Sequence, residues 1–322
     1  MAGRTNLADI IGDYVQERKA LGYRSDKAER VLRGVSRMYR EMGLLGPVLD
    51  KELVIKWTEK RAYESECNRA HRISVIRGLA EYMIRQGYAA YLYPRRSGPL
   101  WQSNYQPHVF SDAEIASLLR RADSCELNAA SPHRHLFLPL LVRILYGSGL
   151  RVSEALSLRK EDVDLNEGVL FVKGAKFGKE RLVPLSRTVH DRCREYVAAM
   201  ERHRVWKDTA YFFPAPHGGK YSVRTAYQHF RKLLWEAGIS HGGRGKGPRL
   251  HDLRHTYAVH CLRKWVKEGV DLTATMPYLS AYLGHSGIRG TQRYLRLTAE
   301  LYPDIVKRTD EHFSWVIPEV NA

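Results

Sequence analysis

Only one region of this chain has the composition of β-strands. Residues 168–173 are rich in β-branched and aromatic types, a turn with two glycines follows, and a second apolar run occupies residues 180–184. Two such runs joined by a short glycine-containing turn predict an antiparallel hairpin or the edge of a small sheet. Because the other regular segments repeat at helical spacing, we expect a mainly α-helical chain with a small antiparallel β-sheet.

The first 90 or so residues predict helices alone. Leu7, Ile10, Ile11, Tyr14 and Val15 lie at the spacing of one helix face, and Gly22 is suited to a helix end. Further helices are predicted over 26–43, 51–62 and 68–87. The basic, turn-forming segment Pro94–Pro99 follows. We therefore predict an N-terminal helical domain over 1–93, a linker over 94–106 and a second domain over 107–322.

The second domain is predicted to open on a capping box. Ser111 and Glu114 have the spacing that satisfies the free amides of a new helix. Further helices are predicted over 136–148, 151–158, 187–203, 223–237, 250–267 and 273–283, with short ones around Tyr294 and over 303–314.

The charge balance favours a nucleic-acid partner. Lys and Arg number 52 against 35 Asp and Glu in 322 residues, a formal net charge of +17. An excess this large, spread along the chain, is typical of proteins that contact many phosphates, although some basic proteins bind acidic partners or membranes. The strongest apolar run, 136–146, contains Arg143 and is too short to span a bilayer.

The expected compartment is the cytoplasm. Arg4, Asp9 and Asp13 do not fit a signal peptide. Cys67, Cys125, Cys193 and Cys261 are widely spaced and without a Cys-x-x-Cys pair, which is typical of reduced cysteines.

Four motifs follow one another in the second domain. They are Gly149–Glu154 with Arg151, Leu250–His255 with His251 and Arg254, Leu283–Ser286 with His285, and Gln292–Tyr294. Arg, His-x-x-Arg, Gly-His and Tyr in this order resemble the catalytic signature of the tyrosine recombinases, the group of Xer proteins, phage integrases and Cre. The resemblance extends over nearly the whole chain and implies a helical core-binding domain followed by a catalytic domain.

The resemblance assigns Arg151 and Arg254 to the two family arginines. A guanidinium is always charged and makes bidentate hydrogen bonds to phosphate oxygens, so a pair of them stabilises the charge of a phosphorane. The alternative is that each is a surface arginine on a helix. The bend that three preceding residues, Gly147–Gly149, place before Arg151 favours the functional interpretation.

Lys176 is the expected general acid, which would protonate the leaving 5′ oxygen. Its segment, Gly174–Arg181, resembles the family's Gly-Lys-Gly-x-Lys-x-Arg turn but has Phe177 where glycine is usual. Lys173 and Lys179 are therefore alternatives for this role.

The resemblance makes Tyr294 the nucleophile, His251 the base or orienting partner of its proton, and His285 a donor to the phosphate. Tyr278, Tyr282 and Tyr302 are nearby alternatives for the nucleophile. Glu154 is expected either to orient an active-site group or to form an ordinary salt bridge.

His255 is expected to be an ordinary buried or surface histidine. His251 and His255 have the spacing of a helical zinc pair, but Asp252 stands where a metalloprotease requires Glu. No carboxylate cluster or ATP-binding loop is evident in the sequence, so we predict no metal and no cofactor.

Other basic residues are candidates for holding DNA. Arg69, Arg72 and Arg77 lie in the predicted helix 68–87, and Arg244 and Lys246 lie in the glycine-rich loop 242–247. The alternatives are a solvated helix end and a plain surface loop.

The resemblance implies site-specific recombination of double-stranded DNA through a 3′-phosphotyrosine, serving integration, excision, transposition or dimer resolution. It implies a homo-oligomer, a dimer on each site and a tetramer in the synapse, and a C-terminal tail that docks on a neighbouring protomer. The apolar residues expected in that tail are Tyr302, Ile305, Val306, Phe313 and Trp315. The alternatives are a type IB topoisomerase, which shares this chemistry, and a DNA-binding protein with a decayed site.

Overall fold

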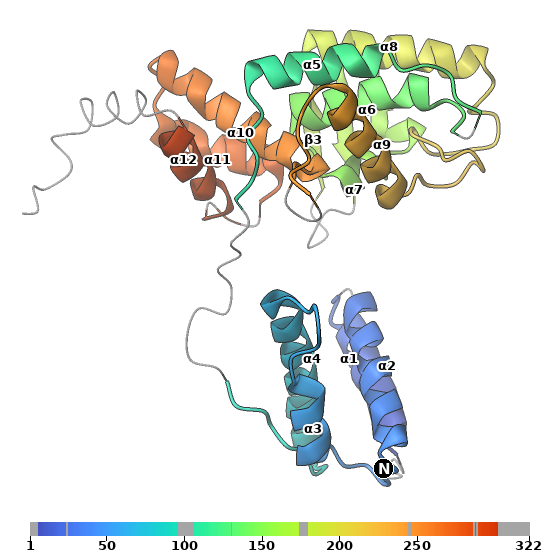
Figure 1. Cartoon of the computed structure of the whole chain (residues 1–322), viewed down its shortest axis with the longest axis vertical. Coiled ribbons are helices and arrows are strands. Elements are labelled where there is room, and N and C mark those ends of the chain that lie inside the picture. The colour runs from blue at the N-terminus through green and yellow to red at the C-terminus, as the bar shows by residue number, and fades with distance from the viewer. Residues whose placement is uncertain are drawn as a thin grey trace, which may run out of the picture. The chain divides into compact units, whose positions relative to one another are not determined.

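The computed structural model describes residues 6–23, 25–95, 106–129, 131–173, 180–243, 247–285, 287 and 289–301. The chain divides into two compact units, Met1–Tyr105 and Gln106–Ala322 (Figure 1). Helices make up most of the described structure, together with a small antiparallel sheet. The predicted fold class is therefore confirmed.

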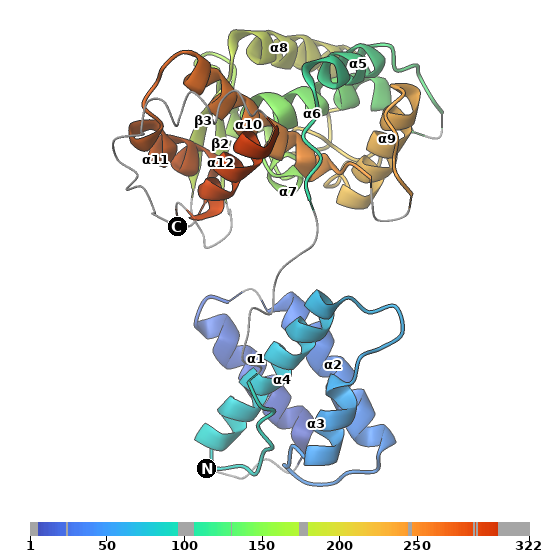
Figure 2. The same cartoon turned by 60° about the vertical axis from the view of Figure 1, so that its left-hand side comes forward.

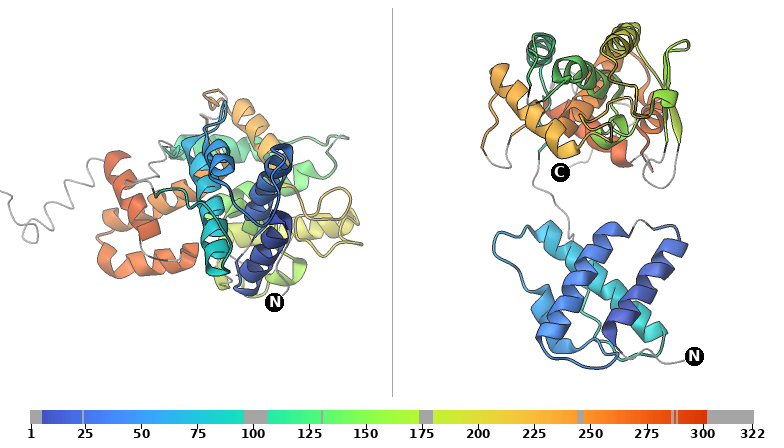
Figure 3. Two further views of the ribbon diagram at one scale, coloured as in Figure 1. Left: turned by 90° about the horizontal axis from the view of Figure 1, so that it is seen from below. Right: turned by 90° about the vertical axis from the view of Figure 1, so that its right-hand side faces the viewer.

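The first unit contains helices α1 (Leu7–Ala20), α2 (Asp26–Glu41), α3 (Lys51–Thr58) and α4 (Glu66–Arg85) (Figures 2 and 3). Polar side chains accept hydrogen bonds from free amides at three of the helix starts. Asn6 accepts from the amide of Asp9, Asp50 from Glu52 and Ser65 from Asn68, at 3.0, 2.6 and 3.2 Å. Each cap precedes a run of apolar residues at helical spacing, and this spacing is why these helices could be predicted from the sequence.

A single apolar core holds the first unit together. Helices α1, α2 and α4 pack against one another, and α3 packs on α2 and α4. Leu7, Leu32, Leu53 and Leu79 come from the four helices and are fully buried there. Gly34 lets α2 approach α3 closely, because a Cβ at this position would lie 2.6 Å from the ring of Trp57.

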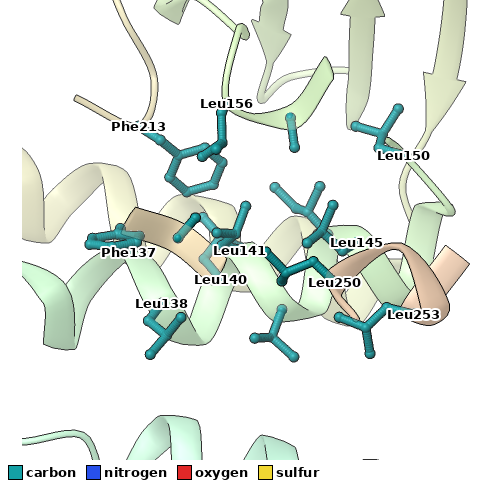
Figure 4. Close-up of a cluster of buried hydrophobic side chains, with 14 of the residues drawn as sticks. Phe137, Leu138, Leu140, Leu141, Leu145, Leu150, Leu156, Phe213, Leu250 and Leu253 are labelled. Atoms are coloured by element: carbon teal, nitrogen blue, oxygen red, sulfur yellow. The ribbon is translucent and has the colours of Figure 1, made fainter. Parts of the chain in front are cut away.

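The second unit is assembled around α6 (Arg134–Ser148). It packs against α5 (Asp112–Asp123), α8 (Arg187–Arg202) and α10 (Leu250–Lys267), and it lies among them in Figure 2. Its apolar residues Phe137, Leu141 and Leu145 meet Leu250 and Leu253 in the buried cluster of Figure 4. The remaining helices are α7 (Val152–Ala155), η1 (Lys160–Asp162), α9 (Val223–Glu236), α11 (Leu272–Leu283) and α12 (Arg289–Leu301).

The predicted capping box and hairpin are both present. Glu114 donates its backbone amide to the Ser111 hydroxyl at 3.2 Å, and its carboxylate accepts the Ser111 amide at 2.8 Å. Strands β2 (Val169–Val172) and β3 (Arg181–Pro184) pair antiparallel with Leu170 opposite Val183. A two-residue strand, β1 (Val163–Asp164), pairs with β2 and was not expected, because two residues carry no periodicity.

Helices α10, α11 and α12 form a second core in this unit. Ala258 and Leu262 of α10 are buried with Leu279 of α11 and Leu297 of α12, and α11 also contacts β3. None of the helices in the described part of the chain combines the length and apolar character needed to cross a bilayer. The helix predicted over 303–314 and the tail residues from Tyr302 onward lie outside the described residues.

Candidate active site

Arg254 is a buried cation at the centre of the motifs. It lies in the second turn of α10 and is 1% exposed, because Leu250 and Leu253 anchor this end of the helix in the core. Its guanidinium donates to the carbonyl of Gly149 at 2.8 Å and to the carbonyl of Leu283 at 2.7 Å. Burial and the nearby Arg151 lower the pKa of Arg254 to about 10, so it stays charged at neutral pH. A buried charge held by neutral carbonyls favours the approach of an anion.

Arg151 is brought to the same place by the turn that precedes it. Gly149 has φ +60°, and a Cβ there would lie 2.7 Å from Leu283 and Tyr257, so only glycine fits this turn. Arg151 then forms the N-terminal cap of α7. Its guanidinium donates to the Glu154 carboxylate at 2.6 Å and to the Gly284 carbonyl at 3.2 Å.

Glu154 joins Arg151 to a third arginine, Arg181 of β3. Its carboxylate accepts the backbone amide of Arg151 at 2.9 Å and the Arg181 guanidinium at 2.9 and 3.3 Å. Burial by itself would raise the pKa of this carboxyl. The hydrogen bonds from Arg181 and Arg151 outweigh burial and lower the pKa to about 2. Glu154 is thus a permanent anion that orients two guanidinium groups.

The Gly-His motif is explained by Arg181. Its Nε donates to the Tyr282 carbonyl at 2.8 Å. Gly284 has φ +67°, and a Cβ on it would lie 2.8 Å from the Arg181 guanidinium. A glycine at this position therefore lets α11 end against β3, and the chain turns directly into His285.

Tyr294 lies in α12 and contacts two histidine rings, those of His255 and His285. The phenol is 3% exposed, its hydroxyl is 3.2 Å from Nδ1 of His255, and its ring stacks on His285 with centroids 5.9 Å apart. His285 is oriented in turn by Thr291, whose hydroxyl is 2.8 Å from its Nδ1. The ring of His251 meets His255 edge-to-face at 4.7 Å.

All three imidazoles are neutral at physiological pH. Burial and neighbouring positive charges lower the pKa of His251 to about 4, of His255 to about 3 and of His285 to about 4. A neutral imidazole offers one donor and one acceptor, so each ring is able to orient a phenol or to donate to an oxygen of a phosphate.

The histidine that the structure places beside the Tyr294 hydroxyl is not the one expected from the sequence. His251 was expected to partner the proton of Tyr294, but His255 is at hydrogen-bond distance of that hydroxyl. His255 was expected to have no special role. A signal existed in the sequence, because His255 follows His251 by one helical turn and so shares its face of α10. Arg181 was also missed, although it closes the lysine-containing segment.

The alternative tyrosines lie elsewhere. Tyr278 is 75% exposed on α11, and the hydroxyl of Tyr282 donates to the Pro184 carbonyl at 3.2 Å. Tyr302 lies outside the described residues. Of the described candidates, Tyr294 is therefore the one that the fold brings to the histidines.

One of the three lysine candidates is described, and it is ion-paired. The Lys173 ammonium is 2.6 Å from Asp162 and 3.5 Å from Glu161. The hydrogen bond that the ammonium donates to Asp162 raises the pKa of this lysine, which makes it a weaker proton donor. Lys176 and Lys179 lie outside the described residues.

The arginines of α4 are engaged within their own unit. Arg72 is 6% exposed, forms a bidentate pair with Glu64, and donates to the carbonyls of Trp57 and Glu59. These contacts argue against the expected role of Arg72 in binding DNA, because its donors already hold the loop after α3.

The other two candidates on α4, Arg69 and Arg77, also make contacts within the first unit. Arg69 donates to the Thr58 carbonyl at 2.9 Å, and Arg77 donates to the Tyr93 carbonyl and pairs with Glu81 at 3.1 Å. Arg244 and Lys246 lie outside the described residues.

An exposed basic stripe on α2 was missed. Its members follow one another at intervals of three or four residues, lie on one face and are exposed: Lys27, Arg30, Arg33, Arg37 and Arg40. Arg30 and Arg37 also line a groove of about 440 Å³ together with Trp57 and Arg61. The spacing was visible in the sequence, but exposure depends on which face of α2 meets the core.

Metal ligands do not gather in the described residues. No group of three or more His, Cys, Asp or Glu side chains there is arranged to hold a metal ion.

Known proteins resemble this chain in both sequence and fold. A sequence model described as the phage integrase family matches residues 109–300. An integrase/recombinase of Sinorhizobium fredii, y4rE, is 32% identical over 300 residues, which are 92% of this chain and 93% of that protein. The tyrosine recombinase XerD of Bradyrhizobium diazoefficiens is 32% identical over 252 residues, 74% of each chain.

A solved structure shares the fold. The lambda integrase dimer bound to a COC′ core site superposes with a TM-score of 0.61 at 16% identity, over 90% of this chain and 95% of that one. The family match covers more than half of the chain, and the fold agrees with it. The chain therefore belongs to the phage integrase family and is a tyrosine-type site-specific recombinase.

Proposed function

We propose that this recombinase cuts and rejoins DNA through a covalent bond between Tyr294 and a 3′ phosphate, without metal or nucleotide. One observation carries the proposal. Arg254 and Arg151 donate to the carbonyls of two consecutive residues, Leu283 and Gly284, and the next residue is His285, whose ring stacks on Tyr294. Two cations, a neutral imidazole and a phenol thus converge on one turn.

In this mechanism the scissile phosphate binds between Arg151 and Arg254. The Tyr294 oxygen attacks phosphorus and its proton leaves to a base, for which His251 is the candidate. The bond from phosphorus to the 5′ oxygen breaks, and Lys176 is the proposed donor of the proton that this oxygen takes up. His285 donates to a non-bridging oxygen. Attack by a 5′ hydroxyl reverses the steps, so one ester is exchanged for another and no external energy source is required.

We further propose that the basic stripe of α2 contacts the DNA backbone. Exposed guanidinium groups spaced along one helix face are suited to successive phosphates. The assembly proposed is a dimer on each site and a tetramer in the synapse. The dimeric DNA complex described for lambda integrase supports the first of these, because its fold matches that of this chain.

Replacing Tyr294 with Phe tests the proposal. The change removes one oxygen, so we expect covalent attachment to DNA to disappear while affinity for the site stays within about twofold. The measurement is trapping on a nicked suicide duplex whose cleavage position has been mapped on DNA flanking the gene. A covalent complex that persists in Tyr294→Phe would contradict the assignment.

The metal-free mechanism is tested in the same assay. Cleavage by the wild-type protein in EDTA, without nucleotide, should equal cleavage in Mg²⁺. Loss of cleavage on chelation with recovery on adding a divalent ion would overturn this part of the proposal.

A further inference from the structure

His255 makes a direct contact with the atom proposed to attack DNA. Its Nδ1 is 3.2 Å from the Tyr294 hydroxyl, and the two rings lie 5.5 Å apart at 55°. Both side chains are buried, with exposed fractions of 7% and 3%. A buried hydroxyl requires a partner, because leaving it unpaired costs roughly 1–3 kcal/mol. The contact is therefore a fixed part of the folded site.

Neighbouring rings restrict both partners. His251 meets the His255 ring at nearly a right angle, 85°, and His285 stacks on Tyr294 at 24°. Helices α10 and α12 pack directly on each other, which fixes the distance between the two side chains. The orientation of the phenol is thus set by its hydrogen bond and by its ring contacts with His255 and His285.

The surroundings of His255 keep its imidazole neutral. Burial, then His251, Arg293, Arg254 and His285, lower the pKa of His255 to about 3. A neutral imidazole accepts a hydrogen bond from a phenol. With Nδ1 of His255 at 3.2 Å from the Tyr294 hydroxyl, His255 is suited to hold this hydroxyl in place.

We propose that His255 is a positioning residue for the nucleophile, accepting a hydrogen bond from the Tyr294 hydroxyl at Nδ1 and so aligning the phenol for attack on the phosphate. This inference rests on the proposed role of Tyr294. Of the three histidines of α10, it gives His255 the task of orienting the phenol and leaves His251 as the candidate base.

The experiment compares three substitutions of His255. His255→Leu removes the hydrogen bond. His255→Asn places an amide oxygen near the position of Nδ1, whereas the longer chain of His255→Gln reaches the position of Nε2 instead. Cleavage is measured in a single turnover on the nicked suicide duplex with protein in excess, beside the dissociation constant for the same DNA and the melting temperature of each variant.

We expect His255→Leu to form the covalent complex about ten- to a hundredfold more slowly than wild type, the range for a misplaced reacting group. His255→Asn should recover most of this rate and His255→Gln less of it, with DNA affinity unchanged in all three. The matched control is His260→Leu on the same helix. It removes a hydrogen bond between a histidine Nδ1 and a different tyrosine, Tyr146, at 3.0 Å, and should cleave at the wild-type rate.

Two results would overturn the inference while leaving the proposed function intact. One is wild-type cleavage by His255→Leu. The other is an Asn variant as slow as the Leu variant, with both losses following the melting temperature, which would indicate a role in packing alone. If instead the wild-type protein forms no covalent complex, or if Tyr294→Phe still forms one, the proposed function itself fails, and with it the inference.

Discussion

At the scale of single residues, the site consists of permanent cations, one permanent anion and neutral imidazoles. Arg254 and Arg151 are tied to backbone carbonyls, and Glu154 is held ionised by Arg181 and Arg151. The histidines are kept neutral by burial and by those same arginines. A bound phosphate would add the negative charge that these groups face together, so the site is electrostatically complementary to its proposed substrate before DNA arrives.

The buried imidazoles make the stability of the DNA-free protein depend on pH. The folded pKa values of His251 and His255, about 4 and about 3, lie below the 6.5 of a free histidine. The unfolded chain therefore takes up these protons first as pH falls. The stabilisation is complete above pH 6.5 and is lost as pH drops through the folded values.

We expect thermal melts to show a fall in stability between pH 6.5 and 4, on the order of 1–2 kcal/mol per histidine between pH 7 and 5 after allowance for solvent screening. Glu154, lowered from 4.5 to about 2, adds a loss that begins only below pH 4.5. A His251→Gln, His255→Asn double variant should have a shallower pH dependence over this window. Equal slopes in the variant and the wild type would disprove this explanation.

At the scale of elements, the site depends on where α11 ends against β3. The carbonyls of its last turn, Leu283 and Gly284, bind two arginines, and Arg181 of β3 occupies the space where a Cβ of residue 284 would lie. Helix α11, strand β3 and the start of α7 are thus joined through one turn.

Gly284→Ala should therefore impair cleavage beyond its effect on stability. The substitution places a side chain at φ +67° and forces the Arg181 guanidinium to move. The matched control is Gly238→Ala, which has φ +73° and no atom within 4 Å of the added Cβ. Both variants should lose about 1–2 kcal/mol of stability from the left-handed backbone. Only Gly284→Ala should lose covalent-complex formation, by about tenfold or more. Equal cleavage by the two variants would show that Arg181 is displaced without consequence.

The longer helices, the capping box and the hairpin were predictable because each leaves a local pattern in the sequence, whereas the helix predicted over 151–158 is only the four-residue α7. Strand β1 was not, because its two residues pair only through contact with β2. The order of Arg151, Arg254, His285 and Tyr294 pointed to one site, and the structure brings these side chains together. The contact between His255 and Tyr294 spans 39 residues and depends on how α10 packs on α12, which no local pattern encodes.

At the scale of the whole molecule, the net charge of +17 is only partly available for binding DNA. Arg72 illustrates the difference, since it is ion-paired with Glu64 inside the first unit. We expect the exposed arginines of α2, rather than Arg72, to contact phosphates. Charge counted from the sequence therefore overstates the interface, and burial decides which cations contribute.

The salt dependence of DNA affinity should distinguish the exposed arginines of α2 from the buried Arg72. Each phosphate contact contributes about −0.9 to the slope of log K against log[salt]. Arg33→Ala combined with Arg37→Ala should make the slope shallower by about one to two units and leave the melting temperature nearly unchanged. Arg72→Ala should leave the slope unchanged and lower the melting temperature, because the Glu64 side chain, 9% exposed, loses its partner at a cost of roughly 3–5 kcal/mol in the first unit. A shallower slope with unchanged melting in Arg72→Ala would restore Arg72 as a DNA contact.

The anchoring of Arg151 and Arg254 to neighbouring carbonyls has a thermodynamic consequence for the encounter with DNA. A long arginine side chain loses roughly 1.5–2 kcal/mol of rotamer entropy when it is immobilised. Here that loss occurs when the second unit folds, since the turn after α11 already holds both guanidinium groups. DNA binding should therefore require no further ordering of these two side chains. If the scissile phosphate binds between them as proposed, its recognition should be close to a rigid-body event, with a rate set by diffusion and charge rather than by rearrangement of the arginines.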